Sequence, residues 1–506
     1  MKDQKKLGLS ISYLNLALGT LTNIFLTPFM IQMLGDDSYS LYKVMQSFAG
    51  PLVMFNLGVS TIVTRAIVKY ETMEEHNLKE KQNTLALAML TSTIMAVLVA
   101  VLGGVMCALV PSVYGANYSD EMTQQGQIIF GIFVLSTIFH ILTDAFNGCA
   151  IGHERFAFNS GLLLLKNLLR VPLIVIVLLM GFNAIVVAAI DCIVAFLIFA
   201  LSSGYTFIIL KERPKLTYIA KRELLEMLSF SAAILMQAIV NQVNNNVDTM
   251  LLGAMIPEKW IITMYSSALL VYGTYNSIVS VMASFFLPKA TRLVTSNATG
   301  EELTDFVIKP GRYQAMIAVA IVAGFVVLGK TFITIWIGSQ YIDAYYVILM
   351  LMIPVTIPLV ENTAISILDA SLKRIYRSVV LVVMAVINVF VSVILIKRFS
   401  FWGAAMGTFL SLCIGHIILM NLYYARTFGM NIPRMFSSIF QGILPMGLLT
   451  ILVCIPLMMW NTASIVGFSI KGAVFLLVYS ALIWRWGVRQ DERNYIRNTF
   501  HVGGRK

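Results

Sequence analysis

The sequence predicts an all-α polytopic membrane protein with about fourteen transmembrane helices. Of its 506 residues, 58% are hydrophobic and 12% are charged, whereas a soluble protein has about 25% charged residues. Apolar windows of about 20 residues, each long enough to cross a bilayer, recur along the chain and alternate with short charged or turn-rich segments. No soluble domain is expected between them, so we expect the protein to act within the membrane.

These windows give the expected helices in chain order. Their approximate cores are 9–33, 41–64, 84–110, 127–148, 158–180, 184–210, 224–252, 261–287, 313–337, 344–370, 376–396, 402–424, 437–460 and 464–486. The first window is too long for the core of a signal peptide, so we expect it to remain as a span. An even number of spans places both termini on the same side of the membrane.

The distribution of basic residues predicts that this side is the cytoplasm. If the N-terminus is cytoplasmic, the inner segments hold about 28 of the 36 Lys and Arg residues, and the outer loops hold few. Basic residues concentrate in the cytoplasmic loops of membrane proteins. The net charge of +11 therefore indicates orientation rather than binding to nucleic acid.

The first two spans carry a pattern that returns loosely in the seventh and eighth. The first helix ends in a Leu-Gly pair at Gly35, an acidic and aromatic turn follows, and the second helix closes in GVSTIVTR at Arg65. The seventh span also ends in a Leu-Gly pair, at Gly253. Internal repeats are usual in alternating-access carriers, and they predict two six-helix lobes around a central cavity. The predicted domains are 1–222 for the N-lobe, 223–430 for the C-lobe, and 431–506 for two further helices and a basic tail.

The end of the first helix, the turn with Tyr39 and Tyr42, and the GVSTIVTR ending resemble one known family. It is the polysaccharide-transporter branch of the MOP superfamily, the Wzx-type O-antigen and capsule flippases, related to MATE exporters and lipid II flippases. The resemblance implies a protein of the bacterial inner membrane that moves an undecaprenyl-diphosphate-linked oligosaccharide from the cytoplasmic to the outer leaflet. The partners it implies are membrane lipids and polysaccharide polymerase or assembly proteins.

Charged residues are expected to meet inside the first lobe. His140 and Asp144 share one face of the fourth span, Lys166 and Arg170 share one face of the fifth, and Asp191 lies in the sixth. One interpretation is two neutralising ion pairs, Asp144 with Lys166 and Arg170 with Asp191. The other is that Lys166 and Arg170 bind a diphosphate, for which forked arginine geometry is suited. Further basic candidates for substrate binding, at the two ends of the second span, are Lys43 and Arg65.

A polar stripe follows one face of the seventh span. Five polar side chains recur there at helical spacing, and exposing each of them to lipid would be unfavourable in free energy. We interpret the stripe as the wall of a cavity whose amides contact substrate and whose carboxylate binds a cation. The alternative is hydrogen bonding between neighbouring helices. The five residues are Gln237, Asn241, Asn244, Asn245 and Asp248.

Two further candidates for a coupling-ion site lie in the tenth and eleventh spans. Glu361 follows Pro354 and Pro358, which permit a hinge. The resemblance to lipid II flippases implies a sodium site that uses an Asn/Asp pair on the eleventh span. Here that span offers Asn388 and no carboxylate, so coupling to Na⁺, to H⁺ or to no ion stays open. The alternative for Glu361 is a protonated acid bonded to Asn388 or His416.

The sequence is less consistent with functions of other classes. A MATE-like cation-coupled exporter of organic cations would need acids in its cavity rather than the cations of the first lobe. A membrane polysaccharide polymerase or ligase would need a large outer loop with clustered reactive residues. The five cysteines are scattered, and nucleophile, metal-ligand and phosphate-loop motifs are not found, so we expect no enzyme activity, cofactor or certain metal site.

Overall fold

The chain is helical throughout its described part. The computed structural model describes residues 2–55, 59–72, 78–218, 246–280, 286–371, 373–460, 462, 464–490 and 492–494. These residues contain no β-strand, which confirms the predicted all-α class. Among them, nine helices are long and apolar enough to cross a membrane, or eleven if each of two bent pairs forms one span. The expected seventh span, 224–252, lies largely outside the described residues.

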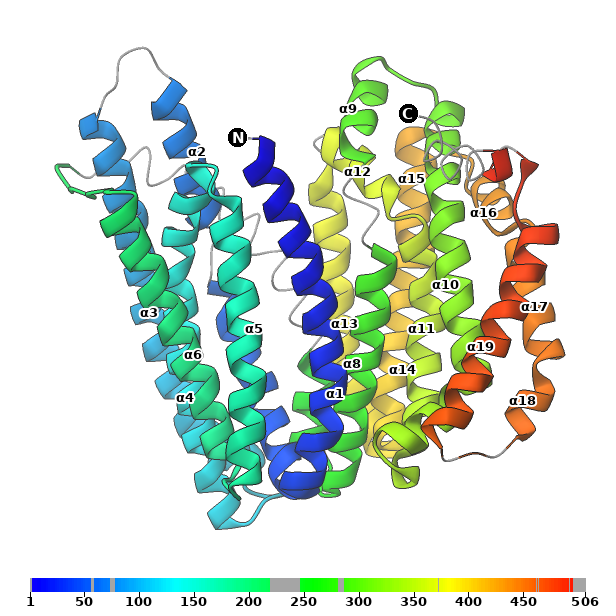
Figure 1. Cartoon of the computed structure of the whole chain (residues 1–506), viewed down its shortest axis with the longest axis horizontal. Helices are drawn as coiled ribbons and strands as arrows, with labels where there is room; N and C mark the ends of the chain where they lie inside the picture. The colour runs from blue at the N-terminus through cyan, green and yellow to red at the C-terminus, as the bar shows by residue number, and fades with distance from the viewer. Residues whose placement is uncertain are drawn as a thin grey trace. The chain divides into compact units, whose positions relative to one another are not determined.

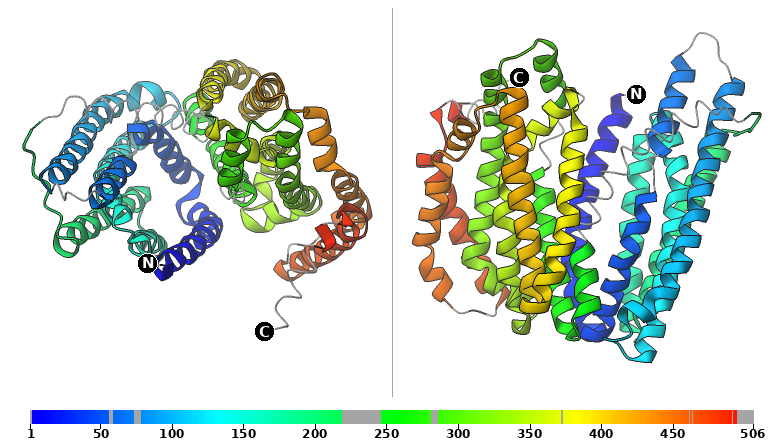
Figure 2. Two further views of the ribbon diagram at one scale, coloured as in Figure 1. Left: turned by 90° about the horizontal axis from the view of Figure 1, so that it is seen from above. Right: turned by 180° about the vertical axis from the view of Figure 1, so that it is seen from behind.

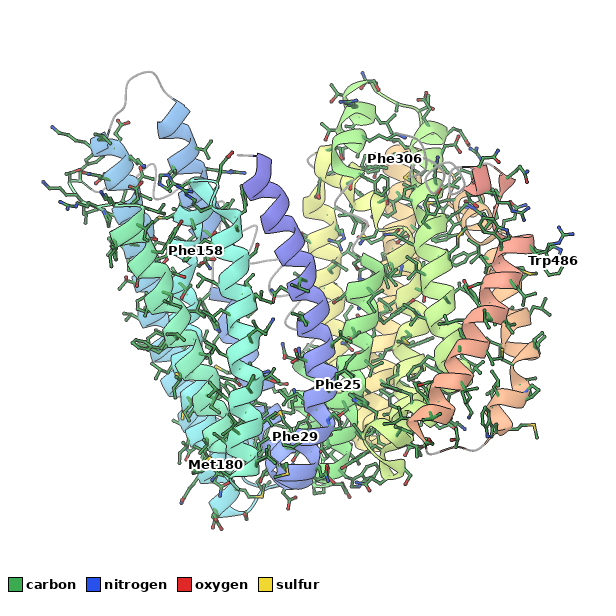
Figure 3. The ribbon with its side chains drawn as sticks, in the orientation of Figure 1. Phe25, Phe29, Phe158, Met180, Phe306 and Trp486 are labelled. Atoms are coloured by element: carbon green, nitrogen blue, oxygen red, sulfur yellow. The ribbon has the colours of Figure 1, made fainter. Side chains whose placement is uncertain are left out.

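The chain divides into two compact units, Met1–Ser266 and Ser267–Lys506. Within each unit the helices pack side by side as a bundle of roughly parallel and antiparallel rods (Figures 1 and 2). Large apolar side chains such as Met180 and Trp486 project from the bundles (Figure 3), with exposed fractions of 67% and 58%. Apolar surface of this kind is typical of helices that face lipid. The chain is a multi-pass membrane protein.

The first unit opens with a long helix that changes direction at Gly35. This glycine has a φ of 71°, in the left-handed region that favours glycine, so the helix end predicted at this Leu-Gly pair is confirmed. The elements of the unit are α1 (Lys2–Ala49), η1 (Gly50–Phe55), α2 (Val59–Thr72), α3 (Leu78–Tyr114), α4 (Asp120–Gly152), α5 (Phe156–Leu179), α6 (Ala184–Gly204), η2 (Tyr205–Ile209), the helical residues 246–255, and the beginning of α8 (Lys259–Ser280).

The second expected span is interrupted rather than continuous. The short turn η1 contains Pro51, which lacks an N–H group for a helical hydrogen bond. The helix α2 begins again at Val59, and the Asp144 carboxylate on α4 accepts a hydrogen bond of 2.8 Å from the backbone N–H of Ser60. At Gly148 of α4, an added β-carbon would lie 2.6 Å from the Ser60 carbonyl oxygen. The missing side chain therefore lets α2 begin directly against α4.

Residues 246–266 belong to the first unit. The Asn117 side chain, in the loop between α3 and α4, donates a hydrogen bond of 2.6 Å to the carbonyl oxygen of Ala254. The Lys259 ammonium donates to the Asn117 carbonyl oxygen at 2.6 Å and lies over the Tyr118 ring. The lobe boundary predicted after residue 222 stays a prediction.

The second unit contains two bent helix pairs. Its elements are the end of α8, α9 (Leu287–Thr295), α10 (Gly300–Trp336), η4 (Ser339–Tyr341), α11 (Ala344–Val360), α12 (Thr363–Ala370), α13 (Arg374–Phe399), α14 (Phe401–Leu412), η5 (Cys413–Met420), α15 (Asn421–Phe428), α16 (Ile432–Phe440), α17 (Ile443–Val453), α18 (Ile455–Met459), α19 (Ile465–Leu482) and η6 (Ile483–Gly487). The axes of α11 and α12 bend by 49°, just after Pro354 and Pro358, and those of α16 and α17 bend by 41°. The sequence anticipates the first bend because proline removes helical hydrogen bonds.

Candidate substrate-binding site

Four helices of the first unit bring charged side chains together. Lys43 comes from α1, His140 from α4, Lys166 and Arg170 from α5, and Asp191 from α6. Both Lys43 and Lys166 lie close enough to Arg170 and Asp191 to experience their charges. At about 1.5 Å per helical residue, Arg170 lies about 13 Å from the end of α5 at Leu179. We call these five side chains the cationic cluster.

The centre of the cationic cluster is a three-membered network. Arg170 Nε donates to Asp191 Oδ1 at 2.5 Å, and the Tyr42 hydroxyl donates to Asp191 Oδ2 at 2.6 Å. Arg170 Nη2 lies 3.3 Å from the Tyr42 oxygen and 3.5 Å from Asp191 Oδ2. The Arg170 and Asp191 side chains are 20% and 13% exposed. This ion pair is one of the two that the sequence predicts, and Tyr42 fixes the carboxylate from its other side.

The two lysines of the cluster have neutral partners. Lys43 Nζ donates to the Gln46 side-chain oxygen at 3.3 Å and lies over the rings of Tyr39 and Tyr42. Lys166 Nζ lies 3.5 Å from His140 Nε2. Because an ammonium group can only donate, the imidazole nitrogen accepts and the ring is neutral. Within the described residues, neither lysine has a carboxylate partner.

The cationic cluster therefore has an excess of positive charge. With both lysines protonated, Lys43, Lys166 and Arg170 contribute three positive charges and Asp191 one negative charge, which leaves two. An unneutralised charge in a membrane-spanning helix costs about 3 kcal/mol on insertion scales. Among the described residues, Arg170 Nη1 also has no hydrogen-bond partner. The excess charge and the free donors suit an anion better than a cation or a neutral molecule.

The structure differs from the second predicted ion pair. Lys166 lies beside His140, and Asp144 caps the N-terminus of α2 through Ser60 rather than binding Lys166. Counting residues from helix ends gives the depth of a side chain but not its direction around the helix, and this explains the difference. Arg65 is an exposed residue of α2.

Most of the predicted stripe on the seventh span lies outside the described residues. These residues are Gln237, Asn241, Asn244 and Asn245. The fifth member, Asp248, is 3% exposed and accepts a hydrogen bond of 2.6 Å from the Tyr265 hydroxyl on α8. The predicted role of the four amides in substrate binding stays a prediction.

The two coupling candidates of the second unit have different neighbours. Glu361 is 3% exposed at the bend between α11 and α12, and its polar neighbours include the Asn421 side chain and the Arg377 guanidinium. Asn388 is 2% exposed and bonds to Thr408 and Ser392 instead. The structure thus gives Glu361 an amide partner other than the Asn388 or His416 that the alternative interpretation names.

An apolar pocket of about 240 Å³ lies within the second unit. Helices α8, α10, α11 and α19 surround it, and its lining includes Val271, Phe325, Phe332, Met352 and Phe468. Aliphatic and aromatic walls without charged groups suit a hydrocarbon chain. No sequence motif marks this pocket, because it forms from residues of four separate helices.

Two features of the structure are not predictable from the sequence. Tyr42 joins the centre of the cationic cluster, whereas the sequence marks its acidic and aromatic turn only by the resemblance to a known family. Arg312 is 1% exposed and binds both carboxylate oxygens of Glu492 at 2.6 and 3.1 Å. Its guanidinium also donates to the backbone carbonyls that end α16 and η6. A single arginine in a charged segment of the sequence does not indicate that it will be buried, or that it will cap the ends of two helical elements.

Comparisons with known proteins agree with this architecture. A family model described as "Polysaccharide biosynthesis protein" matches residues 9–294. The lipid II flippase MurJ in its inward closed conformation is 15% identical, with a TM-score of 0.71 over 94% of this chain and 97% of that one. An inward-facing MATE family multidrug resistance transporter is 12% identical, with a TM-score of 0.64 over 83% and 99% of the two chains.

A third solved structure extends the comparison to another transporter. A MOP superfamily transporter from Pyrococcus furiosus, with a binding pocket of reversed polarity, is 13% identical, with a TM-score of 0.52 over 86% of this chain and 96% of that one. No curated protein sequence matches the chain. The structural likenesses show that the chain has the fold of MOP superfamily transporters. Because the family model covers more than half of its length, the chain belongs to the family of polysaccharide biosynthesis proteins.

Proposed function

We propose that this protein moves an undecaprenyl-diphosphate-linked oligosaccharide from the cytoplasmic to the outer leaflet of the bacterial inner membrane. The observation that carries this proposal is the excess positive charge of the cationic cluster. Three cationic side chains surround one carboxylate at membrane depth, and the lysines retain free donors. A diphosphate supplies the missing negative charge and several acceptor oxygens.

The lipid part of such a substrate needs an apolar environment. The pocket lined by Phe325, Phe332 and Phe468 in the second unit is of the kind that a polyprenyl chain would occupy. The sugar part needs amides and hydroxyls, which the predicted stripe on the seventh span would supply. An apolar pocket of this kind favours an amphiphilic substrate over a small hydrophilic one.

The proposed orientation of the chain follows from the distribution of its basic residues. Basic connecting segments support a cytoplasmic location for both termini. A fold of alternating-access transporters supports movement of substrate between two openings rather than through a channel. We also propose that Glu361 and Asp248, both almost fully buried, couple this movement to H⁺ or Na⁺.

The fold alone is equally compatible with a MATE-like exporter. Such an exporter would bind organic cations, which the net charge of the cationic cluster repels. Polysaccharide polymerase or ligase activity has no support in the described residues beyond membership of the biosynthesis family.

Deletion of the gene tests the proposal directly. We expect complete oligosaccharide units linked to undecaprenyl diphosphate to accumulate, and surface polysaccharide to be lost, because the lipid carrier cannot reach the outer leaflet. Extracted lipids are measured by mass spectrometry, and sensitivity to cationic dyes is measured in the same strains. The wild-type gene restores both phenotypes in the matched control. Normal lipids together with retention of dyes would contradict the proposal and support an exporter.

A further inference from the structure

Asp191 is an unexpected residue for a site that binds an anion. Its carboxylate accepts hydrogen bonds from Arg170 Nε and Nη2 and from the Tyr42 hydroxyl, which fixes its position. A site that only maximised attraction for a diphosphate would leave this position neutral. The chain instead holds one negative charge there, bound through both carboxylate oxygens.

The geometry keeps Arg170 available while it is paired. Asp191 engages one edge of the guanidinium, formed by Nε and Nη2. Among the described residues, the Nη1 group has no partner, and its two N–H bonds can donate to a phosphate oxygen. Arg170 can therefore bind the substrate and Asp191 at the same time. Because Asp191 is not displaced, its negative charge still contributes to the net charge of the cluster when substrate is bound.

The resulting charge can be compared with that of lipid carriers. The cationic cluster has a net charge of two positive units, from three cations and one carboxylate. A diphosphate esterified at both ends, by lipid and by sugar, carries about two negative charges. A diphosphate with a free terminal phosphate carries closer to three, because the second ionisation of a terminal phosphate has a pKa of about 6. The cluster matches the sugar-linked form.

We propose that Asp191 is a specificity-determining residue that sets the charge of the cationic cluster to match a sugar-linked diphosphate lipid and disfavour the same carrier without sugar. This inference rests on the proposed function. The complex of the cluster with the sugar-linked lipid is neutral. The complex with the same lipid diphosphate without sugar keeps an uncompensated negative charge, which is costly in a membrane-spanning site. Asp191 thus excludes carriers whose sugar has been lost or not yet added, and Tyr42 is a positioning residue that holds it.

The test measures the binding of two lipids by the purified full-length protein in nanodiscs. Undecaprenyl diphosphate and undecaprenyl diphosphate with one attached sugar are titrated at pH 7, where the free terminal phosphate is mostly ionised. We expect the wild type to bind the sugar-linked lipid at least about tenfold more tightly. In Asp191→Asn, the cluster gains one positive charge, and we expect this preference to fall to parity or reverse.

Two further variants separate charge from local structure. Asp120→Asn removes a carboxylate at the first residue of α4, outside the cluster, and should retain the wild-type preference. The double variant Arg170→Gln/Asp191→Asn restores two net positive charges without the ion pair. We expect it to bind both lipids more weakly but to regain the preference for the sugar-linked lipid, even if Asp191→Asn alone folds poorly.

The outcomes distinguish this inference from the proposed function. If the wild type binds neither lipid, the proposed function itself fails. Charge matching by Asp191 is excluded if the wild type binds both lipids with equal affinity. It is also excluded if Asp191→Asn and the double variant both keep the wild-type ratio of the two affinities. In either case, transport of a diphosphate lipid stands.

Discussion

Glu361 illustrates how a single buried acid can be linked to a movable element. It ends α11 at the 49° bend, is 3% exposed, and lies beside Asn421 on α15. An ionised carboxylate at this depth is costly, so its charged and neutral states should favour different arrangements of the bend. The two prolines of α11 make that bend easier, because they remove helical hydrogen bonds.

At this residue scale, we expect Glu361→Gln to uncouple transport from the proton gradient. Glutamine preserves the size and hydrogen bonding of a protonated glutamate but cannot release a proton. In proteoliposomes, the flux of lipid-linked oligosaccharide driven by a pH difference should therefore fall at least about tenfold, which corresponds to about 1.4 kcal/mol of added activation free energy. The equilibrium flux without a gradient should remain.

Asp343→Asn is a matched control at the other end of α11. Asp248→Asn is measured in parallel with a sodium gradient, since Asp248 is buried against Tyr265 in the first unit. Flux that depends on pH and on sodium as in the wild type, in both Glu361→Gln and Asp248→Asn, would assign coupling to other groups.

At the scale of elements, the contact between α2 and α4 depends on a residue without a side chain. Gly148 allows the first turn of α2 to lie against α4, where Asp144 accepts the hydrogen bond from Ser60. The Thr64 hydroxyl adds a hydrogen bond to the Gly148 carbonyl oxygen at 3.1 Å. A carboxylate at a helix N-terminus binds the free N–H groups of the first turn and interacts favourably with the helix dipole.

We expect Gly148→Ala to destabilise the protein by about 1–3 kcal/mol, the usual cost of overpacking a well-packed contact. The added methyl group would lie 2.6 Å from a backbone oxygen, which cannot move without displacing α2. Thermal unfolding in detergent, followed by fluorescence, measures the loss as a lower Tm.

Gly131→Ala is the control on the same helix. An added β-carbon there meets nothing within 4 Å, and alanine favours helix by up to about 1 kcal/mol. Equal Tm values for the two variants would show that the Gly148 contact is not required for stability.

At the scale of the whole molecule, the sequence predicts the class and most helices, because hydropathy and helix length depend on local composition. The 3₁₀ turn η1 and the contact of Asp144 with the first turn of α2 are not predictable from the sequence, since Asp144 lies on another helix. The pair of Arg170 with Asp191 is predictable, because the two residues lie at similar depths in their spans. The contact of Lys166 with His140 is not predictable in this way. The cluster's net charge becomes visible only when helix rotation is known.

The placement of residues 246–266 in the first unit has a consequence for transport by alternating access. These residues follow the predicted lobe boundary in sequence, yet Asn117 bonds to Ala254, and Lys259 bonds back to Asn117. By the positive-inside argument, we expect this end of the helices to lie on the outer side. Release of substrate to that side requires an opening, and we expect these contacts to break when it forms.

Cross-linking in a variant that lacks the five native cysteines tests this expectation. In Asn117→Cys/Ala254→Cys, a short reducible bis-methanethiosulfonate reagent should stop transport of the lipid-linked substrate, and reduction should restore it, because the cross-link holds the outer contact closed. Each single-cysteine variant controls for modification alone.

Asn83→Cys/Thr217→Cys is the matched pair, since Asn83 binds Thr217 at 3.1 Å near the other end of α3. We expect that pair to cross-link without loss of transport, since its contact ties the segment after α6 to α3 within one bundle. Undiminished transport by the cross-linked Asn117→Cys/Ala254→Cys protein would mean that the outer contact persists throughout the cycle and that the substrate leaves by another route.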